Sequence, residues 1–140
     1  MSTLQFTIPS TVDAIGPLME KLGPVISRNL PPDEDAQVDL ALREALANAV
    51  IHGNGLDSSK KVHVSLRAGG SRSIRKGCLD FVVRDEGRGF DPDSIADPLA
   101  AEGLLSGHGR GVYLTKAMMD EVRFAKGGKQ VHMRKIGPAS

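Results

Sequence analysis

Three spaced clusters of polar and glycine residues stand out between residues 44 and 114. The first places a carboxylate, an amide and an imidazole at successive steps of four residues, at Glu44, Asn48 and His52. On an ideal helix each such step turns by about 40°, so these side chains would share one face and meet a single ligand. The residues around Asn48 are mostly Ala, Leu and Val, and a buried amide without a partner would cost roughly 1–3 kcal/mol there. The amide therefore needs something to bind.

The amide and the carboxylate of this first cluster suit a metal ion and a proton transfer. Mg²⁺ prefers oxygen ligands, so we expect the Asn48 side chain to be a magnesium ligand. Glu44, one turn earlier, would lie beside a phosphate group and orient or deprotonate an attacking hydroxyl or water. Taken alone, the same pattern also fits a polar stripe on a helix that ends in His-Gly.

The second cluster follows a predicted strand and consists of Asp85, Gly87 and Gly89 with charged residues between them. Its glycines would let the backbone turn closely around a flat ligand. A carboxylate at this place can accept a hydrogen bond from the exocyclic amine of adenine, whereas guanine presents a carbonyl oxygen at that edge. We therefore expect Asp85 to select ATP over GTP. The alternative for this segment is an ordinary polar turn after a strand.

The third cluster is a glycine-rich approach to a predicted helix, with Gly107, Gly109, Arg110 and Gly111. Backbone N–H groups in such a loop, together with the positive end of the helix, would face phosphate groups. Arg110 would add a charge-assisted contact to a phosphate. A flexible loop and a surface arginine are the alternatives. The chain has no G-x-x-x-x-G-K-[ST] motif, which excludes a P-loop.

Hydrophobic periodicity predicts the elements that would position these clusters. Apolar residues alternate with polar ones in strands near residues 4–8, 61–67, 78–84 and 121–125, and in a last strand that ends near 135. They recur at three and four residues in helices over 12–29, 33–52 and 111–120, and Ser10 and Asp13 are placed as a capping box for the first. The long segment 85–107 is expected to be a functional lid. Hairpin connections predict an α+β fold in a single domain, residues 1–140, with a mixed, mostly antiparallel sheet of about five strands and three helices on one face.

Composition restricts the kind of protein further. The 140 residues carry a formal net charge of +1, with no Trp and one Tyr, so we expect no direct nucleic-acid partner. The single cysteine excludes an internal disulfide, and no secretory signal or apolar run of about 18 residues is evident. We therefore expect a cytoplasmic protein that does not contact a membrane. The four histidines have no spacing suited to zinc.

In order, spacing and predicted secondary structure, the three clusters resemble the N box and the two glycine boxes of the Bergerat-fold ATPases, a superfamily that includes DNA gyrase, MutL and histidine kinases. Within it, residues 45–53, 84–92, 109–111 and 119–122 resemble the small anti-sigma-factor serine kinases of bacterial partner-switching systems. The resemblance covers nearly the whole chain. It implies a two-layer α/β sandwich that binds ATP and Mg²⁺, with Glu44 as catalytic base, Asn48 as metal ligand and Asp85 as the adenine contact. It also implies that Gly87, Gly89, Gly109 and Gly111 shape the pocket and its lid.

The same resemblance implies a biological role. Such kinases phosphorylate a serine on an anti-anti-sigma partner of the STAS type, hold a sigma factor or an equivalent regulator inactive, and usually act as homodimers. Relatives often support the base with a Thr in the late strand, where this chain has Lys129 and Gln130. Two alternatives stay open: an ATP-binding module that captures a partner without phosphate transfer, and the ATPase part of a sensor histidine kinase. The presence of Glu44 favours the kinase over the first, and the lack of a phosphoacceptor helix pair disfavours the second.

Overall fold

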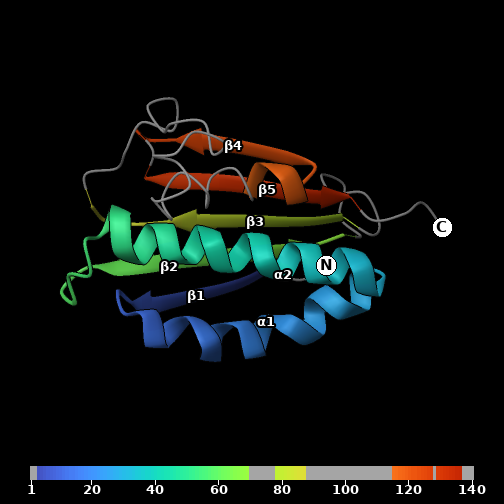
Figure 1. Ribbon diagram of the computed structural model, residues 1–140, viewed down its shortest axis with the longest axis horizontal. Coiled ribbons are helices and arrows are strands. Elements are labelled where there is room, and N and C mark those ends of the chain that lie inside the picture. Colours follow the sequence, from blue (N-terminus) through green and yellow to red (C-terminus); the bar gives the residue numbers. More distant parts are fainter. Residues whose placement is uncertain (1–2, 70–77, 88–114, 128, 137–140) are drawn as a thin grey trace, which may run out of the picture.

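A five-stranded sheet covered by helices makes up the part of the chain that the computed structural model describes, residues 3–69, 78–87, 115–127 and 129–136 (Figure 1). The strands lie in the order β1-β2-β3-β5-β4, and each of the four neighbouring pairs is antiparallel. The prediction of a mostly antiparallel sheet of about five strands is therefore confirmed. The strands are β1 (Thr3–Pro9), β2 (Lys61–Ala68), β3 (Cys78–Arg84), β4 (Glu121–Ala125) and β5 (Gln130–Ile136).

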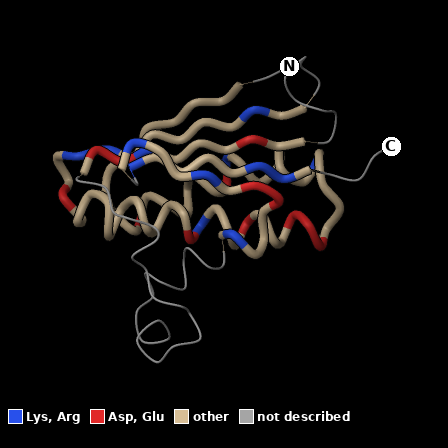
Figure 2. Tube along the Cα trace, turned by 90° about the horizontal axis from the view of Figure 1, so that it is seen from above, with Lys and Arg blue, Asp and Glu red and all other residues tan. Residues whose placement is uncertain are grey.

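The helices lie together on one face of this sheet, as the view turned by 90° shows (Figure 2). A 3₁₀ turn, η1, leads into α1, and α2 continues into a π-helical segment, η2. Residues 115–118 form a further helical turn, which confirms that part of the helix predicted over 111–120; the start of that helix lies outside the described residues. Most of the predicted lid over 85–107 also lies outside them. The bounds are η1 (Val12–Ala14), α1 (Ile15–Asn29), α2 (Pro32–Ala47) and η2 (Asn48–Gly53).

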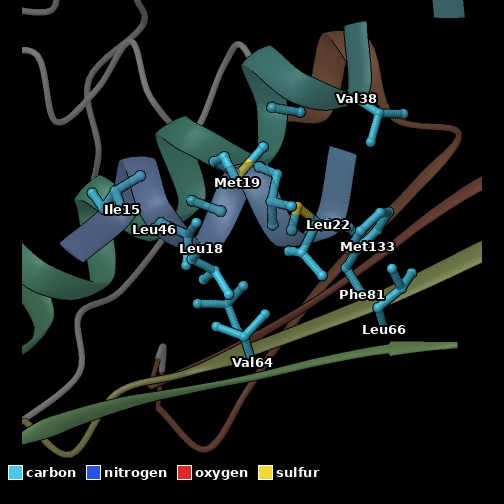
Figure 3. Packing of buried hydrophobic residues seen from close by; sticks show 14 of the residues in the cluster. Ile15, Leu18, Met19, Leu22, Val38, Leu46, Val64, Leu66, Phe81 and Met133 are labelled. Atoms are coloured by element: carbon cyan, nitrogen blue, oxygen red, sulfur yellow. The ribbon is translucent and has the colours of Figure 1, made fainter. Parts of the chain in front are cut away.

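The core lies between the two layers and follows the periodicity of the sequence. In β2 the apolar residues Val62, Val64 and Leu66 are buried, while the polar residues between them face the other side of the sheet. Figure 3 shows side chains of both helices packed against the sheet. Burying one such side chain stabilises the fold by roughly 1.5–3 kcal/mol, so this layer fixes α2 on the sheet. Among the described residues, no helix combines the length and the apolar character that crossing a bilayer requires.

The start of the first helix differs from the prediction, because Ser10 does not form a capping box. Its hydroxyl donates to the carbonyl oxygen of Lys60 at 2.7 Å. Thr11 takes the cap position of η1, and its side chain makes no capping bond. The prediction was wrong because a serine before a helix can satisfy its hydroxyl across the fold as well as locally, and local spacing does not distinguish the two.

The end of the second predicted helix, over 33–52, also differs in its hydrogen bonding. The α-helical pattern stops at Ala47, and Asn48–Gly53 follow with a wider π turn. Accordingly, the backbone N–H of Asn54 donates to Ala49 O, five residues back, at 2.8 Å. Turns of this kind are often found at functional sites. The wider turn changes where His52 lies relative to Glu44 from the ideal-helix expectation.

Candidate functional site

Asn48 is a buried amide at the junction of α2 and η2. It is 9% exposed, and its neighbours Ala45, Leu46, Ala49 and Val50 are buried. Within residues 3–69 and the other described segments, no hydrogen-bond partner reaches its side chain. An unpartnered buried amide costs roughly 1–3 kcal/mol, so a ligand that binds this carboxamide would recover that free energy. Its oxygen is the kind of donor that Mg²⁺ takes.

Glu44 lies one helical turn before Asn48 on the same face of α2. The backbone N–H of Asn48 donates to the carbonyl oxygen of Glu44, which keeps the two residues in helical register. The Glu44 side chain is half-buried and forms no ion pair with any residue the structure describes, whereas the adjacent Arg43 is paired with Asp39 at 2.8 Å. A carboxylate and an amide with free acceptor oxygens therefore point to one side of the helix end.

Asp85 follows β3 directly and is 4% exposed. Its backbone N–H donates to Lys129 O at 2.9 Å, and its Oδ1 accepts from the backbone N–H of Gly87 at 2.9 Å. Burial raises the pKa of this carboxyl, while the Gly87 N–H and the cations Lys129 and Lys60 oppose the rise. A buried carboxylate with acceptor capacity to spare is suited to one directed donor, such as an amino group.

The first and second clusters meet at Gly53. A Cβ added to Gly53 would lie 2.3 Å from Asp85 Oδ2, and one added to Gly87 would lie 1.6 Å from Gly53 O. A side chain at Gly87 would therefore collide with backbone, and one at Gly53 would displace the Asp85 carboxylate. Figure 1 shows that α2 and β3 run in the same direction and end at the same edge of the molecule, which brings these segments together. The contact places the polar end of the helix beside the Asp85 turn.

Of the remaining residues singled out by the sequence, some lie in described segments and others do not. His52 lies in η2, and partial burial lowers the pKa of its imidazole, which favours the neutral form. The carbonyl oxygen of Lys129 accepts from the backbone N–H of Asp85, and Gln130 pairs with Arg84 in the sheet, so both residues contact the Asp85 segment through their backbones. Five residues lie outside the described segments, and their roles stay predictions: Gly89, Gly107, Gly109, Arg110 and Gly111.

Sequence reasoning missed Gly53 and Asn54 as parts of the site. Gly53 ends the stretch that resembles the family, but the sequence assigned neither residue a role beyond ending a helix, where glycine and asparagine are common. The contact of Gly53 with Asp85 joins residues that are far apart in the chain. The sequence held one usable signal, a small residue directly after the Glu-Asn-His stripe.

Comparison with known proteins identifies the family of the chain. The family of the histidine kinase-like ATPase domain matches residues 8–135. The serine-protein kinase RsbW of Bacillus subtilis (strain 168) is 32% identical over 127 residues, covering 86% of this chain and 76% of the relative. The anti-sigma F factor of Priestia megaterium is 31% identical over 93 residues, covering 65% of this chain and 60% of the relative. The chain therefore belongs to the family of histidine kinase-like ATPase domains.

Proposed function

We propose that this chain is an ATP-dependent serine-protein kinase that also acts as an anti-sigma regulatory factor in a partner-switching system. One observation carries the nucleotide site: the buried amide of Asn48 has no side-chain partner among the described residues, and Gly53, at the end of the same helical segment, lies against the buried carboxylate of Asp85. Family membership and the relatives named serine-protein kinase and anti-sigma factor support the rest. ATP is the expected nucleotide because Asp85 presents an acceptor to the exocyclic amine of adenine.

The described residues divide the work between the two ends of the nucleotide. Asp85 would bind the base, with the Gly53 and Gly87 backbones forming the wall next to it. Asn48 would hold Mg²⁺, which when bound neutralises charge on the phosphates. Glu44 would accept the proton of the serine hydroxyl that attacks. The predicted phosphate loop, Gly107 to Gly111 with Arg110, would cover the phosphates, and Gly89 would shape the lid.

The proposed partners follow from the relatives. The names of the relatives support a serine as the phosphate acceptor and a sigma factor or an equivalent regulator as the sequestered target. That the serine belongs to an anti-anti-sigma protein of the STAS type comes from the resemblance of the motifs alone. We also propose a homodimer. The alternative is a module that binds ATP and captures a partner without phosphate transfer. The half-buried carboxylate of Glu44, which pairs with no residue that the structure describes, favours the kinase over it.

A transfer assay tests the kinase directly. The purified chain, Mg-ATP and each STAS-type protein encoded in the same genome are incubated, and mass spectrometry locates any phosphoserine. The kinase predicts one phosphorylated partner, with the product lost in Glu44→Gln. Nucleotide-dependent capture of a partner without phosphoserine would establish the module instead, and a chain that binds no ATP would overturn both.

A further inference from the structure

Asn54 is a buried residue whose side chain joins three separate segments of the chain. It is 3% exposed. Its Nδ2 donates to Ser10 Oγ at 2.7 Å and to Lys61 O at 2.9 Å, and its Oδ1 accepts from the backbone N–H of Glu86 at 2.8 Å. The amide therefore links the end of β1, the start of β2 and the turn that follows β3.

The orientation of this amide is determined by its partners. Lys61 O can only accept and the Glu86 N–H can only donate, so the nitrogen of Asn54 must face Lys61 and its oxygen must face Glu86. Ser10, which is 1% exposed, donates its hydroxyl proton to Lys60 O and so accepts from Asn54. The donor and acceptor of every hydrogen bond in this network are therefore determined. The network presents Asn54 Oδ1 as a fixed acceptor to the turn after β3.

The turn that receives this acceptor contains Asp85. Three successive backbone N–H groups are held there: that of Asp85 by Lys129 O, that of Glu86 by Asn54 Oδ1, and that of Gly87 by Asp85 Oδ1. The middle bond is the one made by a side chain from another element. Without it, the peptide between Asp85 and Glu86 could rotate, and the carboxylate of Asp85 would turn with it.

A second anchor of the turn is exposed and so weaker. The Glu86 carboxylate accepts from the Lys61 backbone N–H at 2.9 Å and contacts His63 Nε2 at 2.7 Å. Side-chain exposures of 31% for His63 and 37% for Glu86 let water compete for these bonds. The buried bond to Asn54 is therefore the main restraint on the turn.

We propose that Asn54 is a positioning residue that holds the Asp85 carboxylate in the orientation that reads adenine, and so sets the discrimination between adenine and a base with a carbonyl group at the same edge. The inference rests on the proposed ATP site and names a residue that acts through Asp85 without touching the nucleotide.

Discrimination between two nucleotides tests this role. ATP and inosine triphosphate differ only at one edge of the base, where adenine has an amine beside the acceptor N1 and hypoxanthine has a carbonyl oxygen beside an N1–H. The dissociation constant of inosine triphosphate divided by that of ATP, measured by calorimetry, therefore reports how well Asp85 is oriented. Asn54→Ala should lower that ratio by about tenfold, equivalent to one charge-assisted hydrogen bond. Partial unfolding would weaken both nucleotides equally and leave the ratio unchanged.

Two further variants separate positioning from packing. Asn54→Asp keeps an acceptor for the Glu86 N–H but puts a carboxylate oxygen against Lys61 O, so its stability should fall while its ratio stays near the parent value. Ser10→Ala removes one partner of the amide and should lower the ratio by less than Asn54→Ala does. If Asn54→Ala does not fold, Ser10→Ala decides the question, and an unchanged ratio there overturns the proposal.

The control is Asn29→Ala, which deletes an amide that donates to Val25 O at 2.7 Å near the end of α1. It should leave the ratio unaltered. A parent protein that binds neither nucleotide would overturn the ATP site itself. A parent that prefers ATP, with Asn54→Ala folded and equally selective, would overturn the role of Asn54 alone.

Discussion

Gly87 lies so close to Gly53 that a Cβ on Gly87 would sit 1.6 Å from the Gly53 carbonyl oxygen. The two glycines come from different motifs, one at the end of η2 and one after β3. Their backbones are in direct contact, and the Asp85 carboxylate lies against the Gly53 Cα side of the same junction. Glycine is required at Gly87 because an added Cβ would meet the Gly53 backbone, whereas a Cβ at Gly53 would meet the Asp85 carboxylate and displace it.

The two glycines should respond differently to alanine. Gly87→Ala must displace backbone and should lower the free energy of unfolding by about 2 kcal/mol or more. Gly53→Ala would meet mainly the carboxylate of Asp85, which can turn away, so the fold should survive and ATP affinity should fall at least about tenfold. Urea unfolding and calorimetry measure the two effects.

A matched control for these glycine variants is Gly23→Ala in α1, where an added Cβ meets no heavy atom within 4 Å outside its chain neighbours. It should leave nucleotide affinity unchanged. Parent-like ATP affinity in Gly53→Ala would contradict the placement of Asp85 at the base.

The preference for ATP should depend on pH through Asp85. Burial raises the pKa of this carboxyl in the folded protein. Folding therefore penalises the charged form of Asp85. This cost to stability is fully present above the raised pKa, shrinks as the pH falls through it, and is gone below the pKa that Asp85 has in the unfolded chain. Adenine needs the carboxylate, so the ratio of inosine triphosphate to ATP dissociation constants should drop as the pH falls through the raised pKa. Calorimetry at a series of pH values measures this.

Asp85→Asn checks the assignment of that pH dependence. An amide can accept from an amine or donate to a carbonyl, so this variant should discriminate poorly at every pH. It should also be at least as stable as the parent at neutral pH, because it no longer buries a charge. A pH dependence that persists in Asp85→Asn would assign the effect to another group.

Asn48 should lower the stability of the ligand-free protein and be needed for magnesium-dependent nucleotide binding. Since its side chain has no partner among the described residues, Asn48→Leu should keep or raise the thermal midpoint of the ligand-free protein. The same change should abolish the dependence of nucleotide affinity on Mg²⁺. Thermal unfolding with and without Mg-ATP follows both quantities. If nucleotide affinity in Asn48→Leu depends on Mg²⁺ as it does in the parent, Asn48 is not a magnesium ligand.

Glu44 should act in transfer and not in binding. Glu44→Gln should keep ATP affinity and slow phosphate transfer to the partner by about 10²–10⁴-fold, the usual share of a positioned base. Asp39→Asn is the control, since that acid is exposed on α2 and pairs only with Arg43 among the described residues. Rapid-quench measurement of phosphoserine compares the variants. Equal rates in Glu44→Gln and the parent would exclude Glu44 as the catalytic base.

Much of the fold followed from local patterns in the sequence. The alternation of Val62, Val64 and Leu66 predicted a half-buried strand, and the apolar stripe of α1 predicted its buried face. Residue type and spacing also predicted roles for Glu44, Asn48 and Asp85, and these roles stay predictions.

What could not be predicted depends on contacts between distant segments. Nothing in the Ala-rich run before His52 indicates that its last turn is a π turn, because that widening depends on how the chain leaves the helix. The bond from Ser10 to Lys60 O, and the contact of Gly53 with Asp85, join residues more than 30 positions apart. Local spacing contains no information on such pairs.

The most direct test of the central claim is a calorimetric titration of the parent chain with ATP and with inosine triphosphate, both with Mg²⁺. An adenine site built on Asp85 predicts tighter binding of ATP, with the difference much reduced in Asp85→Asn. Equal affinities in the parent, or no heat with either nucleotide, would contradict it.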